Sequence, residues 1–208
     1  MNLIKSAWEI VKSNRRAYIV LNVVYYALVI VFMVYAAFNP DLQKTLMDAV
    51  GATFMTGPLS FIGKAYANAE VLRAIFVTLF INLFVGSLGS ITLPSLIIPF
   101  SGLLIGIYRA AMWGLILSPT SPDLRLIMIP HSITLLIEGQ AYILTMLAAY
   151  IQGRSFIWPR TVGYDSHWKG YGEGVKLSAR LYVLIILTLV VAAVYEVIEV
   201  VLMVKLGT

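Results

Sequence analysis

The chain has 208 residues, of which 60% are hydrophobic and only 12% are charged. A soluble domain usually carries about 25% charged residues, so a water-soluble fold of this length is excluded and the composition predicts one integral membrane domain over residues 1–208. The net charge of +5 then reports membrane orientation rather than nucleic-acid binding, and the lack of cysteine excludes disulfides, zinc thiolate sites and cysteine nucleophiles.

The first predicted element is a short cytoplasmic amphipathic helix at residues 1–16. Its apolar side carries Leu3, Trp8 and Val11, and its polar side is mostly basic. The basic residues fit either a plain cap on the first span or a lipid site. The next apolar run, at 17–38, is longer than the roughly 7–15 residues of a signal-peptide core. It matches the about 20 residues that cross a bilayer, which predicts an uncleaved first span.

Residues 40–71 are predicted to form amphipathic helices that lie at the extracytoplasmic membrane interface. Apolar residues recur there at helical spacing, opposite charged ones: Leu42, Leu46, Met47 and Val50. The Gly57-Pro58 pair breaks the segment. A second short helix is expected from 59 to 70.

Two glycine-containing spans follow, at residues 72–91 and 95–117. The first carries Asn82, Gly86 and Gly89. The second carries a small residue at every fourth position: Gly102, Gly106, Ala110 and Gly114. Such a ladder puts a smooth stripe on one helix face, where another backbone can approach closely. The approaching helix belongs either to the same chain or to a second copy, so the stripe predicts close packing and leaves a homo-oligomer open.

The last two spans are predicted at residues 124–151 and 176–204, joined by a cytoplasmic loop at 152–175. Glycines are expected to loosen this loop, and its tryptophans and tyrosines to anchor it at the lipid headgroups. The predicted fold is therefore all-α. It is a polytopic transmembrane helical bundle of about five spans, with interfacial amphipathic helices and no cofactor.

Basic residues predict how the bundle lies in the cell membrane. With five spans and a cytoplasmic N-terminus, five basic residues lie on the extracytoplasmic side. Nine lie on the cytoplasmic side: Lys5, Lys12, Arg15, Arg16, Arg154, Arg160, Lys169, Lys176 and Arg180. Because cytoplasmic segments carry the excess of Lys and Arg, this count predicts a cytoplasmic N-terminus and an extracytoplasmic C-terminus.

Ionisable residues occur within the predicted spans, where they are costly unless they pair or face a protected interior. His131 and Glu138 are seven residues apart and share one helix face. Arg109 on the preceding span matches His131 best in depth and can also reach toward Glu138, while Asn82 can complete the network. We expect an intramembrane polar cluster of these four residues. Its role is either structural, fixing helix register, or functional, as a proton relay or small-ion site.

The order and spacing of these residues resemble the stage II sporulation protein M family over roughly residues 70–155. The matching positions are Asn82, Gly86, Gly89, Pro99, Gly102, Gly106, Pro130, His131, Glu138, Ala141 and Gly153. Ser132 stands where family members tend to have glycine, and Ser101 where asparagine is common. The resemblance implies a multi-span membrane protein. It also implies a scaffold role, like that of the member that helps localise cell-wall-remodelling proteins during engulfment. It supplies no catalytic residues.

Two functions follow as hypotheses. The first is a non-enzymatic membrane scaffold or complex subunit, with the bilayer and an unidentified membrane-protein partner or a second copy as its contacts. The alternative is a transport or channel protein that uses the buried Glu, His, Arg and Asn side chains. A hydrolase ranks below both, because one histidine and one glutamate lack the further ligands usual at catalytic zinc and no nucleophile motif is present.

Overall fold

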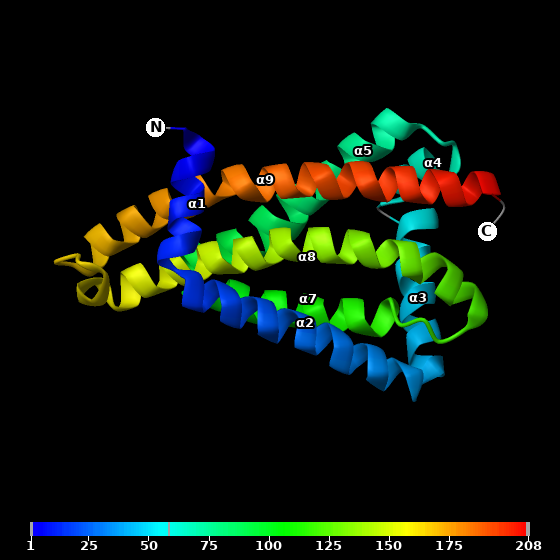
Figure 1. Cartoon of the computed structure of the whole chain (residues 1–208), viewed down its shortest axis with the longest axis horizontal. Helices are drawn as coiled ribbons and strands as arrows, with labels where there is room; N and C mark the ends of the chain where they lie inside the picture. Colours follow the sequence, from blue (N-terminus) through cyan, green and yellow to red (C-terminus); the bar gives the residue numbers. More distant parts are fainter. Residues whose placement is uncertain (1, 58, 207–208) are drawn as a thin grey trace.

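A computed structural model describes residues 2–57 and 59–206, and in these ranges no β-strand occurs. The helices are α1 (Leu3–Ser13), α2 (Arg15–Ala37), α3 (Pro40–Met55), α4 (Ser60–Ala67), α5 (Val71–Phe80), η1 (Ile81–Thr92), α6 (Leu93–Ile97), α7 (Ser101–Ile116), α8 (Pro122–Ile157), η2 (Pro159–Val162) and α9 (His167–Leu206). Long helices run along the molecule, while α1 and α3 cross it near opposite ends (Figure 1). The prediction of an all-α helical bundle is confirmed.

Four helical segments are long and apolar enough to cross a membrane: Arg15–Ala37, Val71–Ile97, Leu124–Ile157 and His167–Met203. The fifth predicted span is the shorter apolar helix α7. Its 16 residues extend for about 24 Å at 1.5 Å per residue, less than the roughly 30 Å of a hydrocarbon core. α7 packs beside α2 (Figure 1).

α3 packs against the C-terminal end of α7. Gln43 of α3 is buried, and its Nε2 donates hydrogen bonds to the carbonyls of Ile116 and Ser118, at 3.0 and 2.6 Å. Thr120 donates to Gln43 Oε1 at 2.5 Å. These bonds satisfy carbonyls that a helix end leaves without an intrahelical partner. The predicted apolar face of this segment thus has a buried polar residue at its centre.

Both predicted amphipathic segments are helical. α1 packs across α9, where Ile10 and Val11 join a core cluster with Leu181, but Leu3 and Trp8 of the predicted apolar side are exposed. The segment at 40–71 is divided as expected. α3 ends at Met55 and α4 begins at Ser60, while Pro58 lies outside the described residues.

The predicted loop at 152–175 is wrong in extent. α8 continues to Ile157 and α9 begins at His167, with only η2 and short turns between them. Glycines that were expected to loosen a loop lie in α9 and allow the two helices to approach closely. A Cβ on Gly170 would collide with the Ser155 carbonyl, and one on Gly174 would lie 3.1 Å from the Gln152 Cα.

The stripe of small residues on α7 is covered by helices of the same chain. A side chain at Gly102 would meet the Ile91 carbonyl, one at Gly106 would meet Met146, and one at Gly114 would meet the Val29 carbonyl. Ala110, between them, is fully buried. The sequence left open whether this face packs on the same chain or on a second copy. In the structure it packs on helices of the same chain.

Candidate functional site

Tyr142 of α8 is the residue that links two of the predicted site residues. It is fully buried, and its hydroxyl donates a hydrogen bond to Asn82 Oδ1 at 3.2 Å. The Arg109 guanidinium lies over its ring, 4.1 Å from the centroid, a favourable cation–π contact. Sequence reasoning missed Tyr142, although its position four residues after Glu138 puts both on one helix face.

A π-helix brings Asn82 to this tyrosine. The predicted span at 72–91 is not a regular α-helix, because η1 is wound as a π-helix, a form that often occurs at functional sites. The Gly86 Cα faces the Tyr142 hydroxyl so closely that a Cβ there would lie 2.8 Å from the oxygen. Ser90 adds a side-chain hydrogen bond to the Gly86 carbonyl. Glycine at position 86 thus permits the contact between η1 and α8.

Glu138 lies on α8 between Tyr142 and His131. Its Oε1 is buried and has no hydrogen-bond partner among the described residues, and the same is true of Arg109 Nε. Arg109 and His131 are the basic groups close enough to act on the Glu138 carboxyl electrostatically. The predicted proximity of Arg109 and Glu138 is therefore present as a charge interaction, while the guanidinium packs on the tyrosine ring.

His131 pairs with a residue of α9, not with Arg109. Its Nδ1 is 3.3 Å from Glu199 Oε1, and Thr134 donates a hydrogen bond to Glu199 Oε2 at 2.9 Å. Depth matching between neighbouring spans pointed to Arg109, but α8 packs most extensively against α9. Glu199 is buried in the α8–α9 interface.

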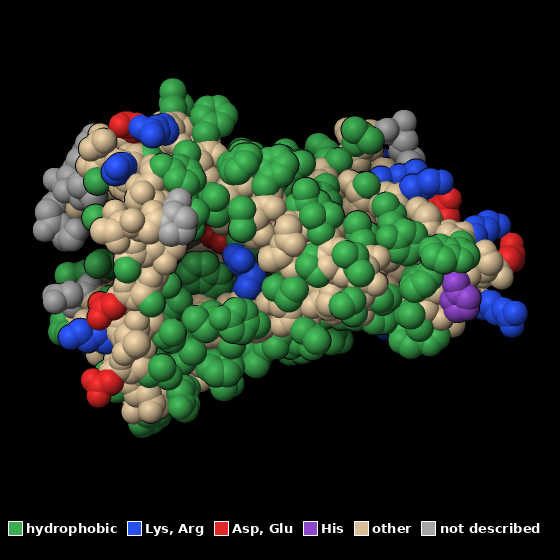
Figure 2. Space-filling view, turned by 180° about the vertical axis from the view of Figure 1, so that it is seen from behind, with side chains coloured by type: hydrophobic (Ala, Val, Ile, Leu, Met, Phe, Trp, Pro, Cys, Tyr) green, Lys and Arg blue, Asp and Glu red, His purple; other side chains and the backbone are tan. Residues whose placement is uncertain are grey.

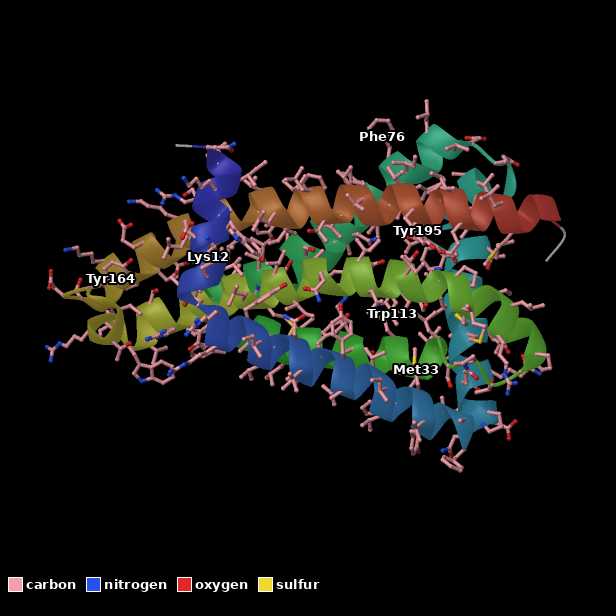
Figure 3. The ribbon with its side chains drawn as sticks, viewed as in Figure 1. Lys12, Met33, Phe76, Trp113, Tyr164 and Tyr195 are labelled. Carbon is pink, nitrogen blue, oxygen red and sulfur yellow. The ribbon has the colours of Figure 1, made fainter. Side chains whose placement is uncertain are left out.

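A cavity of about 270 Å³ joins Glu138 to a second carboxylate, Glu196 of α9. Asn82 also lines it, and its wall is partly aromatic, with Phe54, Tyr66 and Trp113. Figure 3 shows Trp113 between α7 and α8. From the opposite side, Figure 2 shows acidic and basic side chains in a hollow of a face that is otherwise largely hydrophobic.

Tyr66 completes the polar wall of this cavity from α4, outside the predicted spans. Its hydroxyl lies 2.8 Å from Thr78 Oγ1. Burial, reinforced by the negative charge of Glu196, raises the pKa of Tyr66 far above its usual range. The phenol therefore stays protonated at physiological pH, and its dipole lies beside the carboxylate.

The side chains that line this cavity limit which ligands it can bind. In the described part of the chain no group of three or more His, Asp or Glu side chains is arranged to hold a metal ion. Two carboxylates and three aromatic rings face the cavity. Carboxylates supply negative charge, and aromatic faces attract cations. The arrangement can therefore bind a small cation or exchange a proton.

Comparison of the chain with protein-family models, curated proteins and solved structures gives no match. The resemblance to the stage II sporulation protein M family stays a prediction from the sequence pattern. The functional argument accordingly rests on the geometry of the cavity and its side chains.

Proposed function

We propose that this chain is a membrane protein that binds and moves a small cation, with Glu138 and Glu196 as its binding groups. One observation carries the proposal: both carboxylates line the same cavity inside an apolar helical bundle. Ionisable groups at membrane depth are rare and usually mark ion or proton pathways.

The charge balance favours a cation over an anion. Three glutamates gather at the α8–α9 interface, Glu138, Glu196 and Glu199, and the basic groups acting on them are Arg109 and His131. Only Arg109 carries a permanent charge, because histidine titrates near neutral pH. The ionised cluster thus has negative charge left over for a cation or for protons.

The unpartnered oxygen of Glu138 supports a binding role over a purely structural one. A carboxylate kept only to fix helix register is stable inside a protein when its oxygens are hydrogen-bonded or directly paired. Glu199 fits that description through His131 and Thr134. The Tyr142 hydroxyl approaches the Glu138 carboxyl, but Glu138 Oε1 makes no hydrogen bond of ordinary geometry among the described residues, so this oxygen can accept a ligand.

Flux measurements in proteoliposomes test the proposal. The purified chain would be given gradients of protons, Na⁺, K⁺ and methylammonium in turn, with empty vesicles as the baseline. We expect flux above baseline for at least one of these cations, and a loss of about tenfold or more in Glu138→Gln. This loss reflects a charge-assisted interaction of about 1.5–3 kcal/mol.

Glu173→Gln is the matched control, because Glu173 is a solvent-accessible glutamate on α9 that pairs with Lys176 outside the cavity. It should keep wild-type flux. Baseline flux of the wild type for all four cations, or equal flux in Glu138→Gln, would contradict the proposal, provided that size-exclusion chromatography shows both proteins folded.

The scaffold or complex subunit predicted from the sequence remains the alternative function. One of its supports, the small-residue stripe, is covered within the chain, while its small loops and amphipathic segment remain. Baseline flux together with a reproducible companion protein, purified in mild detergent from the native host, would favour it.

A further inference from the structure

A second cavity lies far from the carboxylates, where α1 meets α2 and close to the end of α8. Its volume is about 700 Å³. The residues that matter for its chemistry are Lys12, Arg15, Arg16, Tyr150, Arg154 and Trp158. Arg154 comes from a part of the chain nearly 140 positions after Arg16, so folding gathers these basic groups in a way that the sequence does not display. We call this cavity the basic groove.

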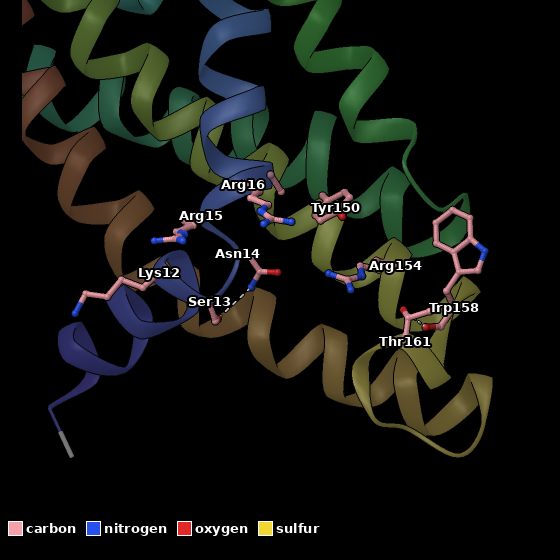
Figure 4. Close-up of a pocket in the computed structure, with 10 residues that line it drawn as sticks. Lys12, Ser13, Asn14, Arg15, Arg16, Tyr150, Arg154, Trp158 and Thr161 are labelled. Carbon is pink, nitrogen blue, oxygen red and sulfur yellow. Dashed lines mark hydrogen bonds between the residues drawn. The ribbon is translucent and has the colours of Figure 1, made fainter.

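Within the part of the chain that the structure describes, the arginines of the basic groove have no acidic partner. Lys12 is paired with Glu9 at 3.0 Å. Among the described residues, however, no acidic side chain pairs with Arg15, Arg16 or Arg154, and no side-chain hydrogen bond to them occurs. Figure 4 shows Arg16 and Arg154 extending into the same space from α2 and α8. Guanidinium groups collected in this way match a phosphate, which they bind through paired N–H donors.

The position of the basic groove points to a lipid phosphate. It lies where one predicted membrane-crossing segment begins, at Arg15, and near where another ends, at Ile157. Ile19 and Val20, on the next turn of α2, are exposed apolar residues. An anionic headgroup in the groove could therefore leave its acyl chains beside an apolar helix surface, at the depth where basic residues meet anionic lipids.

The aromatic rim of the basic groove is built into the fold. Trp158 is half exposed, and its ring lies 5.6 Å from that of Phe100, which also approaches Tyr150 at 6.3 Å. Phe100 has a left-handed backbone, with φ of 68°, at the start of α7. It fits because Gly153 presents no side chain to its ring. Tryptophan and tyrosine are the residues that favour the headgroup level.

We propose that the basic groove binds the phosphodiester headgroup of an anionic phospholipid, with Arg16 and Arg154 as its principal ligands and Trp158 at the headgroup level. This inference is independent of cation transport, because the groove shares no residue with the carboxylate cavity.

Native mass spectrometry of the full chain in detergent tests the site. Phosphatidylglycerol and phosphatidylcholine with the same acyl chains would be titrated separately. We expect phosphatidylglycerol to bind more tightly, and Arg16→Gln and Arg154→Gln each to weaken it by about tenfold, the usual effect of losing a charged hydrogen-bond partner. Arg125→Gln is the matched control, since this exposed arginine lies outside the groove, and it should bind like the wild type.

Two further results separate the possible sources of phosphate and guard against misfolding. Glycerol phosphate and inorganic phosphate should raise the melting temperature little. If they stabilise the wild type as well as the lipid does, the ligand is a soluble phosphate and the lipid proposal fails. Equal binding of the two lipids, or unchanged binding in both arginine variants, would also overturn it. Arg154→Lys keeps the charge but not the paired donors, and should bind at an intermediate level if the site is real.

Discussion

At the scale of single residues, glycines decide how closely the helices of this bundle approach. Gly102 and Gly172 are both helical, but their surroundings are opposite. Gly102 faces the Ile91 carbonyl and the Ser95 side chain, whose hydroxyl accepts a hydrogen bond from the Gly102 N–H at 2.7 Å, whereas a Cβ at Gly172 would meet nothing within 4 Å. The same substitution should therefore have opposite effects at the two positions.

Gly102→Ala is expected to destabilise the protein by about 1–3 kcal/mol, because the new methyl group overpacks a rigid backbone contact. Gly172→Ala should be neutral or stabilising by up to about 1 kcal/mol, since alanine favours the helix. Thermal unfolding in detergent, followed by circular dichroism, measures both. Equal melting temperatures for the two variants would show that the α7 stripe is not closely packed within the chain.

At the scale of elements, polar contacts join the first half of α8 to the C-terminal part of α9. Thr134 and His131 of α8 both contact Glu199 of α9, and Tyr195 donates a hydrogen bond of 3.4 Å to the Pro130 carbonyl. Figure 3 shows Tyr195 between the two helices. Pro130 has no N–H to donate to the Leu126 carbonyl one turn earlier, while its own carbonyl accepts the bond from Tyr195.

Thr134→Val tests the contribution of these polar contacts between α8 and α9. It removes the donor to Glu199 Oε2 and should destabilise the protein by about 1–3 kcal/mol, because a buried carboxylate oxygen loses its partner. Thr145→Val on the same helix is the control, since the buried Thr145 hydroxyl bonds only to the Ala141 carbonyl of α8. Chemical denaturation measures the free energy of unfolding of both variants. If Thr145→Val loses as much stability as Thr134→Val, the contacts to Glu199 have no special role.

How far the sequence could predict these elements depends on whether the signal is local. Helix boundaries near Asn39 and Gly57 follow from local turn chemistry, and the four-residue ladder on α7 follows from helical spacing. The π-helix of η1 has no such local pattern, and the close contact of Gly86 with Tyr142 within it joins residues far apart in the sequence. The glycines at 170 and 174 suggested a loop, because the sequence does not show that α8 packs against them. That packing leaves little room for a side chain at either position.

The candidate site divides in the same way. Burial of ionisable groups near Glu138 could be predicted from composition, since the flanking residues are apolar. The partners of each group could not, because they come from helices whose adjacency is set by the whole bundle. His131 therefore pairs with Glu199 across 68 positions, and Glu196 joins Glu138 at the cavity, while spacing alone had pointed to Arg109.

At the scale of the whole molecule, the arrangement of helices predicts which segments share a side of the membrane. α1 and the C-terminal end of α9 lie toward opposite ends of the long axis in Figure 1. We expect five passages, with the short α7 as one of them, so residues 1–16 and the α8–α9 connection should face the cytoplasm together. α3 should face the opposite side.

The cysteine-free sequence makes this arrangement directly measurable. Lys5→Cys and Asp165→Cys should be protected from a membrane-impermeant thiol reagent added to intact cells, while Asp48→Cys should react. All three positions are exposed and lie outside the carboxylate cavity. Reaction of Asp165→Cys from the outside, with Lys5→Cys still protected, would mean that α7 does not cross the bilayer.

The lengths of α8 and α9 have a practical consequence. Their 36 and 40 residues extend for about 54 and 60 Å at 1.5 Å per residue, far more than the roughly 30 Å of a hydrocarbon core. The connection between them turns at Gly163, whose φ of 84° favours glycine. A Cβ at this position would have no atom within 4 Å, so the surrounding space is open. An epitope inserted after this residue should be exposed to solvent. A bound antibody fragment would then add mass for imaging this small membrane protein.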